Sequence, residues 1–375
     1  MDHFLNRIAI PYLSRPLKAI VHSDALRHNY QTIRRAAKVP VWAALKANAY
    51  GHGLIHVAQS IAQEADGFAV LELEEALALR GVGLLHPILI LEGAFRLEDW
   101  VFAHQHDLIM VVHHEAQIDW LEQLLSQSKI TAPSQVYFKV NTGMNRLGFA
   151  PGQAIKAYER LRSLVPMPQT KITLMTHYAR ADDGLAAATG QNNIFEALCA
   201  QIKPDAISRA NSAAILQDIA TQDSWMRTGI ALYGSTPVDA IPAQQFNLKP
   251  AMSLMSELIS IQTLEKGDAV GYGARFVAEQ TMKIGVVACG YADGYPRTAP
   301  LGTPIMVDGI KTRLVGRVSM DMLTVDLSNV PQAKIGSSVE FWGNSLSVDE
   351  VAAHCGTNGY EMLASLTNRV SVHKD

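Results

Sequence analysis

The first two thirds of the chain repeat one pattern, in which a short apolar or β-branched run is followed by a longer stretch with helical periodicity. Eight runs fit this pattern: VWAAL (41–45), GFAVLE (67–72), PILILE (87–92), LIMVVH (108–113), QVYFKV (135–140), KITLMT (171–176), DAISRA (205–210) and RTGIALYG (227–234). Several are apolar without alternation, which is typical of parallel strands covered on both faces. Eight strand–helix units within about 200 residues predict an α/β fold, a closed (β/α)8 barrel of the TIM type.

The sequence pattern changes after about residue 245. Long strand-like segments alternate with glycine turns and few helices intervene, which predicts a mainly-β domain. These segments are residues 252–264, 283–292 and 317–327. The proline-containing stretch 236–250 is the expected linker. We predict a barrel over residues 13–243 and a β-rich C-terminal domain over 244–375, with residues 1–12 as a further candidate part of it. Segment 16–23 is expected to form a strand that precedes the barrel and pairs with the second domain.

Charge and cysteine usage exclude several classes of protein. The 375 residues contain 32 Lys and Arg against 35 Asp and Glu, a net charge of −3, and neither end carries a block of like charge. We therefore expect neither a nucleic-acid partner nor a membrane partner. The three cysteines, Cys199, Cys289 and Cys355, lack CxxC spacing, which favours a reducing compartment. The chain shows neither a signal peptide nor an apolar run of about 20 residues, so a cytoplasmic protein is expected.

One short motif stands out chemically. AALKANAYGHG (43–53) places a lone lysine, Lys46, at the end of an otherwise apolar strand and before a turn rich in Gly and Asn. The carboxyl ends of barrel strands form the catalytic mouth of such folds. Burial there would lower the pKa of the amine and allow it to attack a carbonyl, as Schiff-base chemistry requires. By position alone, a lysine that reaches from a strand end into solvent is the commoner case.

Eight further motifs follow this one in a fixed order. They are KVNTGMNRLGF (139–149), MTHYA (175–179), RANSAA (209–214), MRTGIALYG (226–234), VGYGARF (270–276), CGYADGYPR (289–297), GRVSMDM (316–322) and YEMLASLTNRV (360–370). With them, the chain resembles the alanine racemase family nearly from end to end. The resemblance implies a homodimeric isomerase that depends on pyridoxal phosphate and interconverts L- and D-alanine, D-alanine being used for peptidoglycan.

The resemblance also assigns residues to the cofactor. Lys46 would bind pyridoxal phosphate covalently, and the other cofactor-binding positions would be Tyr50, His177, Ser212, Arg227, Gly229, Ile230 and Tyr360. Backbone amides in Gly-containing turns suit a phosphate dianion. Arg227 would face the pyridine nitrogen, and a permanent cation there disfavours protonation of that nitrogen. Without the resemblance, Ser212 is equally a capping residue and Arg227 an ion-paired scaffold residue.

Racemisation needs two acid–base groups on opposite faces of the α-carbon. Lys46 serves one face, and the resemblance supplies the second group as Tyr272 of the neighbouring chain. An ordinary tyrosine is a poor base because its pKa is near ~10, and His177 is the residue implied to adjust it. The active sites would therefore be shared across the dimer interface.

The remaining positions concern the substrate. By resemblance, Arg146 and the Met320 amide would bind the carboxylate of a small amino acid, and Asp321 would shape the same wall. Tyr291 would lie at the entrance. Lys139 matches a lysine that carries a carbamate in many relatives. The chain departs from the family pattern at Asn141, where Asp is usual, at Ser319 and Arg209, where Cys and His are common, and in a C-terminus without the second Pro-Arg element.

Three other functions remain open from the sequence. A racemase for serine or basic amino acids would differ only in its pocket, and one methylene changes discrimination by only ~1–3 kcal/mol. A decarboxylase of the same fold would place a carboxylate opposite the pyridine nitrogen, where this chain has Arg227. A non-enzymatic pyridoxal-phosphate carrier would need only the barrel. We expect no metal site, because the histidines at 104, 106, 113 and 114 lack acidic or Cys partners at ligand spacing.

Overall fold

The computed structural model describes residues 15–220 and 222–375, which form two compact units. One unit is His22–Ala251, and the other combines the chain up to Val21 with Met252–Asp375. The predicted contribution of residues 1–12 lies outside the described residues. Among the helices in the described ranges, none has the length and apolar character needed to cross a membrane.

The first unit contains the eight predicted strands. They are β2 (Val41–Ala44), β3 (Gly67–Val70), β4 (Ile88–Ile90), β5 (Leu108–Val112), β6 (Gln135–Lys139), β7 (Lys171–Met175), β8 (Ala206–Ser208) and β9 (Met226–Thr228). All neighbours are parallel, in the order β9–β2–β3–β4–β5–β6–β7–β8. At the open seam, the Ser224 N–H donates to Ile207 O (2.9 Å) and the Arg227 N–H donates to Ala210 O (3.0 Å). The predicted (β/α)8 barrel is confirmed.

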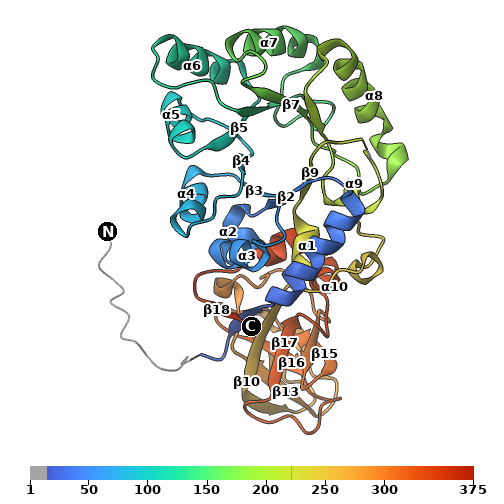
Figure 1. Cartoon of the computed structure of the whole chain (residues 1–375). Coiled ribbons are helices and arrows are strands. Elements are labelled where there is room, and N and C mark those ends of the chain that lie inside the picture. Colours follow the sequence, from blue (N-terminus) through green and yellow to red (C-terminus); the bar gives the residue numbers. More distant parts are fainter. Residues whose placement is uncertain (1–14, 221) are drawn as a thin grey trace. The chain divides into compact units, whose positions relative to one another are not determined.

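Helices cover the outside of this sheet, and Figure 1 shows α4 to α8 following one another around it. The helices of the unit are α1 (Ser23–Ala37), α2 (Lys46–Tyr50), α3 (Leu54–Ile61), α4 (Leu73–Gly81), α5 (Leu97–Gln105), α6 (Glu115–Ser126), α7 (Pro151–Leu164), α8 (Leu185–Ile202), α9 (Ser212–Leu216) and the 3₁₀ turns η1 (Ile230–Tyr233) and η2 (Ala243–Phe246). In α1, residues Leu26, Tyr30 and Ile33 are buried. Their spacing of three and four residues places them on one helix face, which explains the helical periodicity of this segment.

The eighth predicted strand is only partly correct. Residues 227–234 were expected to be a strand, but β9 ends at Thr228 and η1 follows. A short apolar run cannot be assigned to strand or helix by periodicity alone. In the folded unit, Tyr233 donates its hydroxyl to Ala44 O (2.8 Å), and this bond ties η1 to the end of β2.

The barrel interior is filled by large side chains. Trp42 on β2 donates its indole N–H to the Tyr137 hydroxyl on β6 (2.8 Å), and it stacks on Trp225 with ring centroids 4.4 Å apart. A Cβ at Gly67 would lie 2.5 Å from the Trp42 ring, so only glycine fits on the neighbouring strand. The interior is therefore a packed core, and chemistry is confined to the strand ends.

The first unit also extends beyond the predicted boundary at residues 243 and 244. The Lys249 N–H donates to the Asn29 side chain (2.8 Å), and the Ala251 N–H donates to Tyr233 O (3.1 Å). These bonds fasten the segment after η2 to α1 and η1. The division therefore falls between Ala251 and Met252.

The second unit is mainly β, as predicted. Its elements are β1 (Lys18–Val21), β10 (Met252–Leu264), β11 (Ala269–Val270), η3 (Tyr272–Ala274), β12 (Phe276–Val277), β13 (Met282–Val287), η4 (Tyr291–Asp293), β14 (Pro304–Val307), β15 (Ile310–Val315), β16 (Leu323–Asp326), β17 (Ser338–Trp342), α10 (Val348–His354), α11 (Gly359–Ala364) and β18 (Ser371–Lys374). Strands β10, β17, β14, β15, β16 and β13 pair in that order, and β13 returns to β10. The predicted pairing of segment 16–23 is also confirmed, because β1 runs antiparallel to β10.

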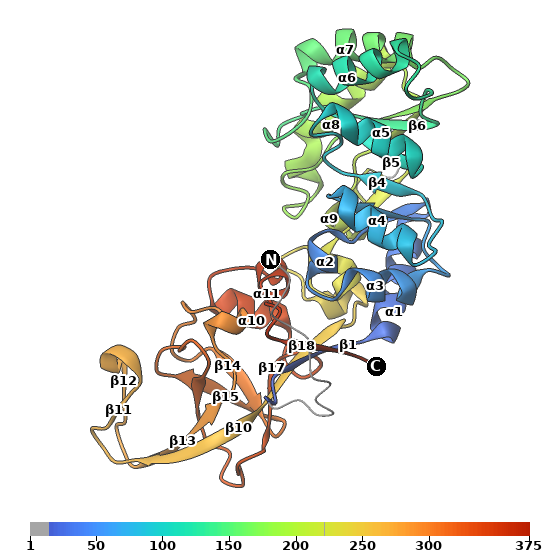
Figure 2. The same ribbon diagram turned by 90° about the vertical axis from the view of Figure 1, so that its left-hand side faces the viewer.

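Two strand predictions in this unit were too long. The predicted strand 283–292 ends at Val287, and in the predicted strand 317–327 only β16 is extended. The two connecting segments instead cross closely: a Cβ at Gly290 would lie 2.3 Å from Met320 O. Figure 2 shows the hairpin β11–β12 at the end of the long strands β10 and β13. This hairpin carries η3.

Candidate functional site

Lys46 follows β2 directly, at the carboxyl end of the barrel. Burial lowers the pKa of its amine, and the nearby Arg146 guanidinium lowers it further, whereas Glu92 and Glu75 act in the opposite direction. The neutral amine is therefore more populated than in an exposed lysine. This is the protonation state that a nucleophile or a proton acceptor requires.

A left-handed turn follows Lys46. Ala47, Asn48, Ala49 and Tyr50 have φ values of 55°, 53°, 53° and 52°. For residues other than glycine this conformation costs about 1–2 kcal/mol each, with Asn the best tolerated. The Asn48 side chain accepts the Leu54 N–H (2.9 Å), which fixes the exit of the turn. A strained segment of this kind persists only where its surroundings hold it, and such segments cluster at functional sites.

Lys139, Arg146 and Arg227 form a cationic cluster at the same end of the barrel, with the neutral His177 beside them. Lys139 ends β6, His177 follows β7 and Arg227 lies in β9, so parallel strands bring all three to one end. Burial lowers the pKa of Lys139 to about 8, with further lowering by Arg227 and Arg146. Burial also holds the pKa of His177 well below its ordinary value, with Arg227 next in effect. The field of this cluster favours an anionic ligand such as a phosphate or a carboxylate.

Arg227 is buried among neutral oxygen atoms. It donates to Ser208 Oγ (2.5 Å), Thr176 O (2.7 Å) and Arg209 O (2.9 Å). The sequence left open an ion-paired scaffold role, but these three acceptors carry no charge. Burial lowers the pKa of Arg227, and Asp223, the acid that acts most strongly in the opposite direction, pairs with Arg209 instead. The guanidinium of Arg227 is therefore held by neutral oxygen acceptors and not by a paired carboxylate.

The Arg209–Asp223 pair supports this arrangement. Asp223, whose side chain is fully buried, accepts Arg209 Nε–H (2.8 Å), the Arg209 N–H and the Ala210 N–H (2.8 Å). We expect Asp223→Ala to lower the free energy of unfolding by about 3–5 kcal/mol, because it removes the buried carboxylate that accepts from Arg209 and from two backbone N–H groups, and leaves the buried guanidinium only its half-exposed partner Glu196. Urea unfolding measures the loss. The matched control is Asp183→Ala, which breaks an exposed pair with Arg180 and should cost at most about 1 kcal/mol. Equal losses in the two variants would contradict this role.

A polar cradle lies beside the cations. The Gly229 N–H donates to Ser212 Oγ (2.9 Å), and a Cβ at Gly229 would lie 2.7 Å from the Tyr50 hydroxyl. Ile230 begins η1 directly after this glycine. Hydroxyl groups and backbone amides converge here without an intervening side chain, and such groups suit a phosphate dianion. The residues present thus fit the phosphorylated cofactor implied by the resemblance.

The other predicted residues belong to the second unit, and all four of its predicted contact side chains are exposed. Tyr272 on η3 is 72% exposed, Met320 is 52% exposed, Tyr360 on α11 is 41% exposed and Tyr291 on η4 is 37% exposed. Main-chain bonds join two of the four segments: the Tyr291 N–H donates to Ser319 O (3.0 Å), and the Ala292 N–H donates to Met320 O (3.0 Å).

Charged side chains hold the Met320 segment. Arg369 donates to the Asp321 carboxylate (2.7 Å), and Arg15 donates to Asp321 O (2.7 Å) while pairing with both oxygens of Asp293. Asp321 is therefore bonded through both its carboxylate and its carbonyl oxygen, contacts that no sequence pattern predicts.

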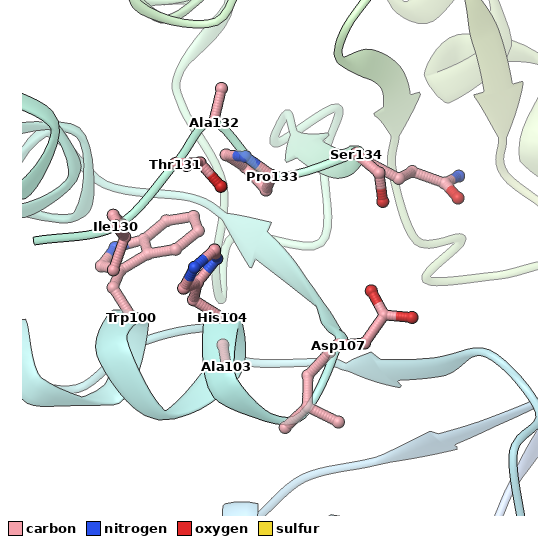
Figure 3. A pocket seen from close by; sticks show the side chains of 11 residues that line it. Trp100, Ala103, His104, Asp107, Ile130, Thr131, Ala132, Pro133 and Ser134 are labelled. Atoms are coloured by element: carbon pink, nitrogen blue, oxygen red, sulfur yellow. The ribbon is translucent and has the colours of Figure 1, made fainter. Parts of the chain in front are cut away.

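Two pockets of the barrel unit lie at opposite strand ends. A small one is lined by Lys139, Arg146, Thr176 and His177 and belongs to the cationic cluster. The other, drawn in Figure 3, lies at the amino ends of β5 and β6 and is lined by Trp100, His104 and Asp107, among others. It contains no comparable group of cations. The described part of the chain has no cluster of three or more His, Cys, Asp or Glu residues suited to a metal ion.

Sequence reasoning missed the residues that position this site. Arg227 donates to Ser208 and to Thr176, and Asp223 accepts the N–H of Ala210 nearby. These three acceptors follow no recognisable spacing in the sequence. His52 and Tyr233 contact the left-handed turn. Both lie within quoted motifs, so their location could have drawn attention to them, although their contacts could not be foreseen.

Comparisons with known proteins identify the family of this chain. The family model "Alanine racemase, N-terminal domain" matches residues 21–237, and "Alanine racemase, C-terminal domain" matches residues 251–374. An alanine racemase of Burkholderia mallei is 49% identical over 97% of this chain and all of its own.

Solved structures give the same result. The biosynthetic alanine racemase of Pseudomonas aeruginosa has a TM-score of 0.91 and 44% identity, covering 96% of this chain and 99% of its own. The Acinetobacter baumannii alanine racemase has a TM-score of 0.89 and 34% identity, covering 96% of this chain and all of its own. By sequence, by fold and by both of its domains, the chain belongs to the alanine racemase family.

Proposed function

We propose that this protein interconverts L- and D-alanine with pyridoxal phosphate as its cofactor, acting as a homodimer. The observation that carries the proposal is Lys46, an amine of lowered pKa at the carboxyl end of a barrel strand. The cationic cluster and the polar cradle beside it provide the complementary charge for an anionic cofactor. D-alanine made in this way is suited to peptidoglycan synthesis.

The residues of the barrel unit fit the cofactor. Lys46 would bind it covalently, Tyr50, Ser212 and the amides at Gly229 and Ile230 would hold its phosphate, and Tyr360 is a further proposed phosphate contact. When bound, pyridoxal phosphate supplies an electron-withdrawing ring that makes the α-proton of an amino acid more acidic. Arg227 would face the ring nitrogen, and its permanent charge would oppose protonation of that nitrogen. This limits electron withdrawal and favours returning the proton over decarboxylation or transamination.

Proton transfer is assigned to two residues. Lys46 Nζ would accept or donate a proton on one face of the α-carbon, and the Tyr272 hydroxyl of a second copy would do so on the other. The exposure of Tyr272 on a short hairpin supports delivery to another chain. His177, kept neutral by burial, would accept a hydrogen bond and adjust the acidity of Tyr272.

Substrate selection is assigned to neighbouring groups. Arg146 and the Met320 amide would bind the substrate carboxylate, with Asp321 holding the loop and Tyr291 at the entrance. The Met320 N–H has no hydrogen-bond partner among the described residues, which supports a role in binding. A decarboxylase is disfavoured because Arg227, the residue proposed to face the ring nitrogen, is a cation held by neutral oxygen atoms, whereas a decarboxylase would place a carboxylate there.

Deuterium incorporation tests the proposed function. Incubation of the purified protein with L-alanine and pyridoxal phosphate in deuterated water should yield both enantiomers carrying α-deuterium. Chiral chromatography with mass spectrometry measures both. Release of carbon dioxide, or the absence of D-alanine, would overturn the proposal. Serine and lysine as alternative substrates distinguish an alanine racemase from a broader one.

Lys139 carries a prediction of its own. An amine with a pKa of about 8 is roughly 10% neutral at pH 7, against roughly 0.04% for an ordinary lysine, and carbon dioxide adds only to the neutral form. We expect ¹³C-bicarbonate to produce a carbamate signal in the NMR spectrum of the folded protein. The signal should weaken as the pH falls from 8 to 6, because the neutral fraction decreases.

The assignment to Lys139 needs a control. Lys139→Ala should remove the signal, whereas Lys171→Ala, which alters an exposed lysine at the amino end of β7, should retain it. A signal that survives Lys139→Ala would reassign the carbamate. The resulting negative charge would pair with Arg146 and compensate for the absence of an acid at Asn141.

A further inference from the structure

His52 is buried beside the left-handed turn and has no role in the chemistry described above. It is fully shielded from solvent. Its Nδ1 lies 2.9 Å from Tyr50 O and 3.2 Å from Ala49 O. A carbonyl oxygen only accepts hydrogen bonds, so Nδ1 must carry the proton and donate to both residues.

The second ring nitrogen of His52 is unsatisfied within the described part of the chain. Nε2 has no hydrogen-bond partner among the described residues, and the ring lies 4.6 Å from the Tyr233 ring. Burial lowers the pKa of His52 to about 4, so the ring is neutral at pH 7. The structure thus accepts an unsatisfied buried nitrogen at this position. A buried nitrogen without a partner lowers stability. Its presence here indicates that the two bonds donated by Nδ1 compensate for that cost.

Tyr233 contacts both His52 and Tyr50, a residue of the polar cradle. Its ring stacks on Tyr50 with centroids 4.7 Å apart, and its hydroxyl donates to Ala44 O (2.8 Å). Tyr233 also ends η1, which begins at Ile230. The two chain segments that would hold the phosphate, one with Tyr50 and one with Gly229 and Ile230, are therefore joined through the rings of Tyr50, Tyr233 and His52.

We propose that His52 is a positioning residue, which holds the left-handed turn Ala47–Tyr50 through two carbonyl groups and, with Tyr233, sets Tyr50 against Gly229. The inference rests on the proposed function in that Tyr50 and Gly229 are taken as phosphate contacts. Four consecutive residues with positive φ require an external restraint, and the Nδ1 bonds reach the last two of them. His52 itself does not touch the cofactor.

Two substitutions distinguish the contribution of the Nδ1 hydrogen bonds from that of the aromatic ring. His52→Phe keeps an aromatic ring and removes the donor, whereas His52→Asn places an amide N–H near the position of Nδ1. The dissociation constant of pyridoxal phosphate, measured by absorbance titration of the full-length apoprotein, should rise about tenfold or more in His52→Phe. His52→Asn should recover most of that loss. Binding by His52→Phe within about twofold of wild type, or equal losses in the two variants, would overturn the proposal.

His86 provides a matched control. Its Nε2 bonds to Ala62 O (2.8 Å), its ring lies 5.0 Å from Phe68, and its Nδ1 is buried without a partner among the described residues. It lies after α4, before the amino end of β4, and away from the cradle. His86→Phe should lower the urea midpoint as His52→Phe does, but it should leave cofactor binding unchanged. Weaker binding in His86→Phe would mean that general destabilisation explains the effect.

A background substitution tests the turn itself. Ala47 is exposed and has a φ of 55°, so Ala47→Gly relieves backbone strain without removing buried contacts. In the Ala47→Gly background, the loss of binding caused by His52→Phe should be at least about threefold smaller. An equal loss in both backgrounds would show that His52 does not act through the turn.

The outcomes also distinguish the inference from the proposed function. If His52→Phe does not fold, Tyr233→Phe carries the test, because it removes the bond to Ala44 O while keeping the stacked ring. It should weaken cofactor binding about threefold, and unchanged binding would overturn the proposal.

If wild type and His86→Phe racemise alanine while the His52 variants bind normally, only the inference fails. If wild type does not bind pyridoxal phosphate, both fail.

Discussion

Lys46→Ala is expected to reduce alanine racemisation by about 1,000-fold or more. The substitution removes both the proposed covalent anchor of the cofactor and one of the two proton-transfer groups. The rate is measured from D-alanine formed out of L-alanine. Borohydride treatment of the protein incubated with pyridoxal phosphate should leave no cofactor attached, whereas the wild type should retain it on Lys46.

The control for this result is a lysine at the other end of the barrel. Lys171 is the exposed first residue of β7, at its amino end, and Lys171→Ala should retain full activity and cofactor attachment. Attachment that persists in Lys46→Ala would show that another lysine is the anchor. The assignment of the carboxyl strand ends as the site would then be wrong.

Tyr272→Phe is expected to suppress α-proton exchange from one enantiomer of alanine by about 100-fold or more while largely sparing the other. The phenyl ring preserves shape but has no proton to transfer, and Lys46 continues to serve its own face. Separate incubations of L- and D-alanine in deuterated water, followed by NMR, measure the two exchange rates. Equal losses for both enantiomers would contradict the assignment of one residue to each face.

Mixing the two inactive variants tests whether the sites are shared. In a heterodimer of Lys46→Ala and Tyr272→Phe subunits, one site would combine the intact lysine of one chain with the intact tyrosine of the other. Random exchange of subunits should restore about a quarter of wild-type activity, because half of the dimers would hold one intact site of two. If each chain formed its own complete site, mixing would restore nothing.

Much of the fold followed from periodicity. The runs at 41–45 and 171–176 contain β2 and β7, because consecutive apolar residues next to helical stretches are characteristic of parallel strands. The end of the run at 227–234 was misassigned, since the apolar residues of η1 have no period that separates a strand from a 3₁₀ turn. Segment 317–322 was misassigned as well. Its loop conformation depends on the close contact between Met320 and Gly290, which are distant in sequence.

The candidate site also has some features that could be predicted from the sequence and others that could not. The place of Lys46 after an apolar strand drew attention to it, but by position alone a solvent-reaching lysine was the commoner case, and the motif order shared with a known family supplied its role and the remaining assignments. The lowered pKa of Lys139 and the neutral partners of Arg227 could not be foreseen. Both depend on which side chains from separate strands converge, and on how much water they exclude.

The amino-acid sequence by itself determined the number and order of the barrel strands, the mainly-β second domain and the position of Lys46 at the end of an apolar strand. These are properties of local pattern, and hydrophobic periodicity and motif order carry them. Only the tertiary structure decided the left-handed turn after Lys46, the contacts of His52 with Tyr50 and Ala49, and the uncompensated charge of Arg227. The physical reason is that strain, burial and hydrogen-bond pairing depend on neighbours that the chain brings together only when it folds.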